Sequence, residues 1–566
     1  MNYTIVIANK RKARLIRDFL ASTDLIEVSL STSTNLFYLA ASSGKDRLDD
    51  VGFFKGYAID HDNKEIVFSG SGVAPSDDQQ VEGCFIKVNY SGDEVRISND
   101  IFAQLSMLYF GDCGVAAISD SLFVLTELRR TLDLPVKIDS EVMVGRSWLN
   151  GAAAQLLNER TPIRDVYFAT PGTRLRVAFS SDRFVHLSCE REPIQEVFQA
   201  GIEGYRETIR EGAYRTSSVI RSLLSIAESD VSLALSAGLD SRVCFAAGLI
   251  ADTDKNLFLN SNKKRQEEYQ IASRLATEFG YSFSSPTVGK ERAPLDRLSL
   301  WFLTCAGIYD PLHSPRSKSA GSTSFAIGGH GAELYKGNYG WRAISTISRY
   351  VPDVGQVYRD QCEEGLSQIG VDPKDKWGSE WHYLAFRNAI HSGRSTMSSL
   401  LGVRPLLQRK LVGLSRASIN EYPAPRKGDP SIVTDLLIAM NPNLAKHAFD
   451  DDKKNLSGSY VDERSLYLGH VDGADVYKIF GSPDNVKFGC PKVFQYLVGK
   501  VGLTGNINLS TIPPLVDQAI DVVPRELRAC YEPLYVLSKN ELKDPVVAPS
   551  RASMATGKLL TFLMAR

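Results

Sequence analysis

The hydrophobic pattern of this chain changes its period near residue 192. Before that point, short apolar or alternating runs are separated by clusters of Asp, Asn, Gly and Ser, as in GYAIDHDNKEIVFSGSG. This pattern is typical of strands joined by hairpin turns. After it, apolar residues between Ile194 and Ile209 recur at three- and four-residue steps, as on one face of a helix. We therefore predict two domains, an antiparallel β-rich domain at 1–192 and a second domain at 193–566.

The second domain begins with strands and helices in alternation. The runs at 231–236, 257–261 and 324–329 are apolar and end in small or polar turn residues, and helix-like stretches follow the first two. This order predicts an α/β domain built on a parallel sheet with crossover helices, whose ligands bind at the carboxyl ends of the strands. From about residue 340 onward we expect mostly helices.

Composition excludes several classes of protein. The 65 Lys and Arg residues nearly balance the 66 Asp and Glu residues, so the net charge of −1 favours neither nucleic acid nor an anionic membrane as a partner. The eight cysteines include no CxxC pair, which argues against zinc or redox chemistry. The sequence contains no secretory signal and no apolar run of membrane-spanning length. We expect a soluble, cytoplasmic protein with reduced cysteines.

The strongest local signal is the string SAGLDS, from Ser236 to Ser241, between a predicted strand and a predicted helix. Small residues allow backbone N–H groups to close on an anion, and the helix N-terminus adds partial positive charge. Ser236 and Ser241 can donate hydroxyl hydrogens, and Asp240 can hold a magnesium ion. The alternative is an ordinary strand-to-helix turn in which Ser and Asp serve as caps. We predict a phosphate-binding loop.

Three segments, in order, make the assignment more specific. The SAGLDS string resembles the SGGxDS pyrophosphatase loop of ATP-dependent enzymes that release pyrophosphate. The segment Gly328–Tyr339 is similar to the GEGADELFGGY segment of the asparagine synthetase family, and Arg394–Ser398 and Arg404–Leu407 are similar to its DRMSM and RxPFLD segments. This resemblance implies an adenine nucleotide α-hydrolase-like (PP-loop), ATP-binding synthetase domain at 193–566.

The first domain resembles the glutamine-hydrolysing domain of the same family. Glu82–Tyr109, Leu122–Leu128 and Thr161–Gly172 are similar to its central hairpin, its LYY...ASELKAL stretch and its closing T-P...P-G-x-L pattern. The resemblance implies an Ntn-hydrolase-like αββα fold. Asn2 stands where the family has its nucleophilic cysteine, so we expect a degenerate domain without glutaminase activity. In β-lactam synthetases and lasso-peptide cyclases, which share this loss, an amine of the substrate is the nucleophile; free ammonia is the other option.

Several positions depart from the family's pattern. Glu333 stands at the position of the family's Asp and Leu334 at that of its Glu, and the resemblance implies that Glu333 binds magnesium together with Asp240. His330 stands where the family has Glu or Tyr. An imidazole there can accept a proton from an attacking ammonium, although a structural histidine is the alternative. Ala237 replaces the first glycine of the loop.

The resemblance also implies a late lysine that stabilises adenylation. We assign this role to Lys446, with Lys487 as a more distant candidate, and place Arg404 near pyrophosphate. The loop Tyr309–His313 is a candidate for the substrate pocket because it lies between the second and third predicted strands. The predicted site comprises the ATP-binding residues Ser236, Ala237, Gly238, Asp240, Ser241 and Gly329, the catalytic residues His330 and Lys446, and the metal ligands Asp240 and Glu333.

The predicted activity is ATP-dependent amide-bond formation, with ATP and Mg²⁺ required. A small-molecule or peptide carboxylate attacks the α-phosphate, and an amine or ammonia then displaces AMP from the acyl-adenylate. The alternative is a catalytically inactive scaffold of the same family that binds a partner, which Ala237 and Leu334 would favour. A thiolating enzyme is disfavoured because only Cys244 lies close behind the loop. The sequence leaves open the identity of both substrates and whether the chain forms a homodimer.

Overall fold

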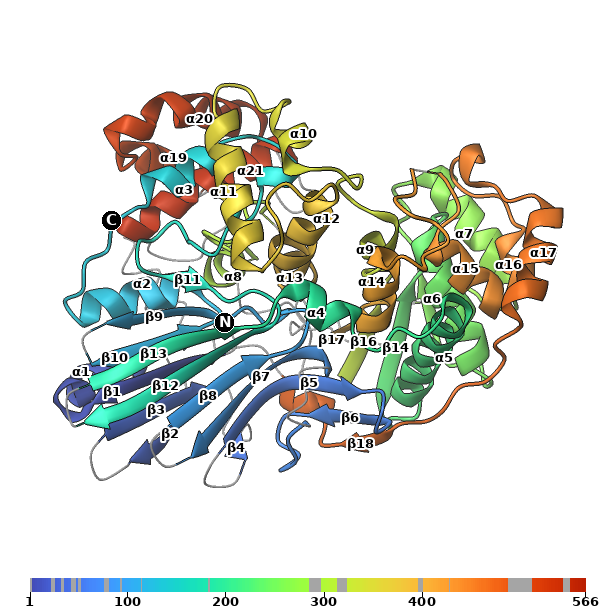
Figure 1. The fold of residues 1–566 in the computed structure, drawn as a ribbon, viewed down its shortest axis with the longest axis horizontal. Coiled ribbons are helices and arrows are strands. Elements are labelled where there is room, and N and C mark those ends of the chain that lie inside the picture. The colour runs from blue at the N-terminus through green and yellow to red at the C-terminus, as the bar shows by residue number, and fades with distance from the viewer. Residues whose placement is uncertain are drawn as a thin grey trace.

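The chain is a mixed α/β protein with antiparallel sheets in its N-terminal part and a parallel four-stranded sheet later (Figure 1). This arrangement comes from a computed structural model and confirms the predicted change from antiparallel to parallel pairing. The structure describes residues 3–21, 26–31, 35–41, 47–48, 52–75, 81–91, 94–112, 114–181, 184–284, 297–312, 323–394, 401–426, 428–486, 512–542 and 550–566.

The first sheet has the strand order β11-β9-β10-β1-β3-β2. Its central strand β1 pairs antiparallel with β10 and β3, and nearly all of its side chains are buried. Helices α1 (Ala13–Ala21) and α2 (Leu122–Thr131) pack against this sheet. The strands are β1 (Tyr3–Asn9), β2 (Ile26–Ser31), β3 (Asn35–Ala41), β9 (Leu108–Asp112), β10 (Val115–Ser119) and β11 (Tyr167–Phe168).

The second sheet faces the first and has the order β13-β12-β8-β7-β5-β6-β18, with β4 paired to β5. Its last strand, β18, comes from the C-terminal third of the chain and pairs parallel with β6, whereas the other pairs are antiparallel. The strands are β4 (Arg47–Leu48), β5 (Gly52–Asp60), β6 (Glu65–Phe68), β7 (Glu82–Ser91), β8 (Glu94–Asn99), β12 (Thr173–Ser181), β13 (Phe184–Arg191) and β18 (Lys478–Phe480).

The third sheet is parallel and has the order β15-β14-β16-β17. The three predicted strands are present as β14 (Ser229–Ala234), β15 (Phe258–Asn260) and β16 (Thr323–Ile327). Each ends one or two residues before the predicted end, where the turn already begins. The fourth strand, β17 (Leu401–Val403), lies in the region that we expected to be mostly helical.

The helix predicted from Ile194 onward is two helices. The first, α4 (Ile194–Gln199), ends before Gly201, and the second, α5 (Tyr205–Leu224), begins after Gly204. Gly201 has a φ of +71°, a left-handed conformation that interrupts a right-handed helix. Helices α6 (Leu239–Ala251) and α7 (Gln266–Glu278) then lie where the sequence predicts them.

The remaining helices form two groups on either side of the parallel sheet. In Figure 1, α15 to α17 lie beside α5, α6 and α7, α14 lies next to α9, and α10 to α13 lie with α3 and α19 to α21 above the antiparallel sheets. Their bounds are α3 (Ser140–Arg146), α8 (Arg297–Thr304), α9 (Glu333–Lys336), α10 (Ile344–Ser348), α11 (Gly355–Gln368), α12 (Gly378–His382), the π-helix η3 (Tyr383–Asn388), α13 (Ala389–Gly393), α14 (Arg409–Arg416), α15 (Ile432–Met440), α16 (Pro442–Ala445), α17 (Gly458–Leu468), α19 (Ile512–Asp521), α20 (Arg528–Glu541) and α21 (Arg551–Leu560).

The C-terminal helix α21 returns to the N-terminal part of the chain. Lys558 of α21 is fully buried and donates hydrogen bonds to the carbonyl oxygens of Arg146 and Ala153, both at 2.6 Å. It also pairs at 2.6 Å with Asp310, whose other carboxylate oxygen accepts from Arg146. Three segments that are far apart in sequence therefore meet at one buried ionic cluster.

One large cluster of buried apolar side chains runs from Tyr3 to Met564. It includes both antiparallel sheets and the parallel sheet, so the predicted segments 1–192 and 193–566 share this core. In the described part of the chain, no helix combines the length and the apolar character that crossing a membrane requires. The six described cysteines are free thiols, four of them buried.

Candidate active site

The order of the parallel strands reverses between β14 and β16. From β14 the chain passes to β15 on one side and later to β16 on the other. Ligands of open α/β sheets bind at such a reversal, outside the carboxyl ends of the strands. At this edge β14 continues into the loop Ser236–Ser241 and β16 into the turn Gly328–Glu333. Both segments that the sequence singled out therefore lie at this reversal.

These two segments touch at Gly329. A Cβ atom on this glycine would lie 2.6 Å from the Cβ of Asp240 and 2.7 Å from its carbonyl carbon. Such distances are well inside van der Waals contact, so a side chain at position 329 would push the two turns apart. The structure thus gives Gly329 a packing role next to the loop.

The loop Ser236–Ser241 is closed by its own two serines. The backbone N–H of Ser236 donates to Oγ of Ser241 at 3.0 Å, and the two hydroxyl oxygens lie 2.9 Å apart. Gly238 N–H donates to Oγ of Ser236 at 3.2 Å. Gly238 is the N-cap residue of α6, and no side chain caps this helix, so N–H groups of its first turn have no side-chain acceptor. Ala237 is fully buried and does not have a positive φ, so its extra methyl group is tolerated.

Asp240 projects from the first turn of α6 and pairs with Lys336. Nζ of Lys336 lies 2.6 Å and 2.7 Å from the two carboxylate oxygens. The Lys336 and Asp240 side chains are 37% and 33% exposed, so the pair is accessible from solvent. Lys336 is the last residue of the short helix α9, which Glu333 begins.

Glu333 lies three residues before Lys336 in α9. Its Oε2 accepts the backbone N–H of Gly331 at 2.9 Å, and burial, together with the nearby Asp240 carboxylate, raises its pKa. Two neighbouring carboxylates repel each other, and their oxygens are suitable ligands for a divalent cation. Within the described residues, however, no group of three or more His, Cys, Asp or Glu side chains gathers around one point. Phosphate oxygens would have to complete the coordination.

His330, in the Gly328–Glu333 turn, belongs to a cluster of aromatic rings and guanidinium groups. Its ring meets the ring of His391 edge to face, with centroids 5.5 Å apart. Nδ1 of His391 lies 2.8 Å from the hydroxyl of Tyr309 and accepts from Arg394 at 2.9 Å. Because Arg can only donate, His391 carries its ring proton on Nε2. Arg394, from the third motif segment, thus lies one ring away from His330.

Arg404 follows β17, the fourth strand of the parallel sheet. Its Nη1 lies 3.5 Å from the carbonyl oxygen of Ala326, and a Cβ on Gly328 would lie 4.0 Å from the same nitrogen. Burial lowers the pKa of Arg404, and its Nε has no hydrogen-bond partner in the structure. A largely buried guanidinium with unused donors at this edge is suited to binding an anion.

Lys446 forms an ion pair with a residue outside the loop. Its Nζ donates to Asp462 at 2.6 Å, an exposed pair. The next residues are tied to the loop: Arg242 donates to the carbonyl oxygen of His447 at 2.8 Å and to that of Ala237 at 3.3 Å. Burial lowers the pKa of Arg242 to about 10.

The sequence alone assigns no role to two of these side chains, Lys336 and Arg242. Lys336 occupies an apolar position of the family's motif, and only its spacing of three residues from Glu333 signals a shared helix face. Arg242 follows the loop directly and was read as part of a helix. Asp310, expected near a substrate pocket, lies instead in the buried cluster with Lys558 and Arg146. Met397, Ser398, His313 and Lys487 lie outside the described residues.

Comparison with known proteins adds no assignment. No protein-family model matches the chain. No curated protein matches it either. The site must therefore be interpreted from its own residues.

Proposed function

We propose that this protein is an ATP-dependent, AMP-forming amide-bond ligase of the asparagine synthetase type. The observation that carries the proposal is the meeting of the SAGLDS loop and the Gly328–Glu333 turn on the two sides of the strand-order reversal. On this proposal, residues 193–566 contain a PP-loop synthetase domain. Residues 1–192 are a degenerate Ntn-hydrolase-like amidotransferase domain without glutaminase activity. Two facing antiparallel sheets, with α1 and α2 against the first, support that assignment.

In the first half-reaction, an oxygen of the substrate carboxylate attacks the α-phosphorus of ATP and the bond to pyrophosphate breaks. The uncapped N–H groups at the start of α6, the hydroxyls of Ser236 and Ser241, and Arg404 would hold phosphate oxygens. Asp240 and Glu333 would hold Mg²⁺, which neutralises phosphate charge when bound. Lys336, already beside Asp240, would then turn its ammonium toward the phosphates.

In the second half-reaction, an amine attacks the acyl carbon of the adenylate, AMP leaves, and the amine loses a proton. His330 stands beside the Gly329 contact and would accept that proton. His391 carries its proton on Nε2 and would orient His330 through their ring contact. The substrates are a small-molecule or peptide carboxylate and an amine or ammonia.

The test is product analysis with Mg-ATP and a panel of carboxylates and amines. The proposal expects AMP and pyrophosphate in equal amounts, dependent on a carboxylate, and a loss of at least about a hundredfold in Asp240→Asn. Asp254→Asn is the matched control, because Asp254 is an exposed carboxylate just beyond the other end of α6. ADP as the product, or equal rates in both variants, would contradict the proposal.

A second candidate is a scaffold that has lost catalysis. This candidate is favoured because two side chains expected to act on ATP already form ion pairs within the protein: Asp240 with Lys336, and Lys446 with Asp462. The scaffold predicts no binding of Mg-ATP at millimolar concentration. Isothermal titration of the intact chain with a non-hydrolysable ATP analogue separates it from the ligase, which must bind the nucleotide before any chemistry.

A further inference from the structure

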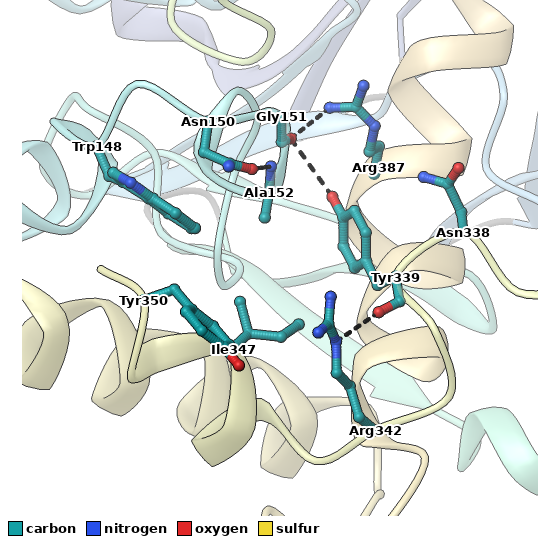
Figure 2. Close-up of a pocket in the computed structure, with 10 residues that line it drawn as sticks. All are labelled: Trp148, Asn150, Gly151, Ala152, Asn338, Tyr339, Arg342, Ile347, Tyr350 and Arg387. Carbon is teal, nitrogen blue, oxygen red and sulfur yellow. Dashed lines mark hydrogen bonds between the residues drawn. The ribbon is translucent and has the colours of Figure 1, made fainter. Parts of the chain in front are cut away.

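A hollow lies between the N-terminal part of the chain and the helical group above the antiparallel sheets. It is a cavity of about 420 Å³. One wall comes from the segment Trp148–Ala152, which follows α3, and the other from the turn that begins at Asn338, two residues after Lys336 (Figure 2). Cavities of this size bind small organic molecules.

The cavity combines positive charge with aromatic rings. Arg342 and Arg387 line it, and none of its lining residues is acidic. In the described part of the chain neither guanidinium forms a salt bridge, and Nε of the largely buried Arg387 has no hydrogen-bond partner. Trp148, Tyr339 and Tyr350 supply the aromatic surface, and Tyr350 is 71% exposed at the rim. A hollow with two cations and no acid attracts an anion.

The two arginines are already held in position. Nη1 of Arg387 donates to the carbonyl oxygen of Gly151 at 2.6 Å and to Oε1 of Gln155 at 2.8 Å. Nε of Arg342 donates to the carbonyl oxygen of Tyr339 at 2.7 Å. Arg387 lies on the π-helix η3, a distortion that is frequent at functional sites. Binding would therefore require little ordering of these side chains, which favours affinity.

The wall opposite Trp148 is fixed by one buried carboxylate. Glu380 is fully buried and accepts the backbone N–H groups of Asn338 at 3.0 Å and Gly340 at 2.8 Å, together with that of Tyr339 between them. The Tyr339 ring then packs edge to face on Tyr383, with centroids 5.0 Å apart. The Glu380 carboxylate is therefore hydrogen-bonded to backbone N–H groups of the turn.

We propose that this cavity is a binding site for an aromatic carboxylate, with the carboxylate on Arg342 and the ring against Trp148 and Tyr350 (Figure 2). A planar guanidinium matches the two oxygens of a carboxylate, and the aromatic walls favour a flat apolar body. This inference does not rest on the ligase activity, because it requires no nucleotide.

The experiment is isothermal titration of the full chain, without ATP, with benzoate, phenylacetate and hippurate and with their primary amides. We expect saturable binding of at least one acid, and binding of its amide at least about tenfold weaker. Arg342→Gln should weaken binding of the acid by about tenfold, and Arg342→Lys by less. Quenching of tryptophan fluorescence by the acid should decrease in Trp148→Phe.

The matched control is Arg349→Gln, which removes the same charge from an exposed arginine on the end of α10 that does not line the cavity. It should bind like the unaltered chain. Arg342 is exposed, so we expect Arg342→Gln to leave the fold intact. The proposal is overturned if no acid binds below about 10 mM. It is also overturned if acid and amide bind equally, if Arg342→Gln binds like the control, or if inorganic phosphate competes as well as the acids.

Discussion

The ion pair between Lys336 and Asp240 is the residue-scale feature that most affects the proposed chemistry. Both side chains are about one-third exposed, so the pair contributes little to the free energy of unfolding. The pair matters because it places the ammonium of Lys336 beside the carboxylate of Asp240, within the loop Ser236–Ser241. A lysine so placed is available for phosphate once a ligand draws Asp240 away.

We therefore predict different outcomes for the two candidate lysines. Lys336→Met should reduce AMP formation by at least about a hundredfold and change the free energy of unfolding by less than about 1 kcal/mol. Lys446→Met removes a similar exposed pair, with Asp462, and tests the sequence assignment directly. Activity that survives in Lys336→Met and disappears in Lys446→Met would return the adenylation role to Lys446. Pyrophosphate release and urea unfolding are the measurements.

A second prediction at the residue scale concerns pH. Burial lowers the pKa of Lys558 from 10.5 to about 8. Between these values the unfolded chain holds a proton that the folded chain lacks, so the free energy of unfolding should rise with pH across this window. The size of this contribution is about 3 kcal/mol. We expect no such rise in Lys558→Met. The measurement is denaturant unfolding of both chains between about pH 7.5 and about pH 10.5. Parallel curves for the two chains would contradict the assignment.

At the scale of elements, the turn that connects α9 to the cavity depends on Glu380. Its carboxylate accepts the backbone N–H groups of three consecutive residues of the turn. Glu380→Gln should lower the free energy of unfolding by about 1.5–3 kcal/mol, because hydrogen bonds to a charged acceptor are lost. Glu363→Gln, which removes a carboxylate paired with Arg359 within α11, should change it by about 0.5 kcal/mol or less. Equal losses of the free energy of unfolding in the two variants would contradict this role of Glu380.

Elements also differ in how well the sequence predicts them. The strands β14 and β16 and the helices α6 and α7 follow apolar runs long enough to show their period. The strands β17 and β18 have three residues each, too few for any period to show. The break between α4 and α5 depends on the backbone conformation of Gly201, which the hydrophobic pattern does not record.

At the scale of the whole molecule, one buried apolar cluster includes residues on both sides of the predicted domain boundary near residue 192. The buried apolar cluster is continuous, β18 joins the second antiparallel sheet, and Lys558 binds backbone of the N-terminal part. We predict one cooperative thermal transition by calorimetry, with equal calorimetric and van't Hoff enthalpies. Two separable transitions, one of them retained in a chain that ends at residue 192, would show that the two parts fold independently.

The sequence by itself determined the local features: the change from antiparallel to parallel pairing, the positions of most strands in the parallel sheet, and the loop Ser236–Ser241 at a strand end. These depend on residues close together in the chain. The tertiary structure alone decided that Lys336 holds Asp240, that Asp310 is buried with Lys558, and that Trp148 and Arg387 line one cavity. Each of these contacts joins positions separated by about a hundred residues or more, and no local pattern specifies which distant side chain will complete a buried charge or a cavity wall.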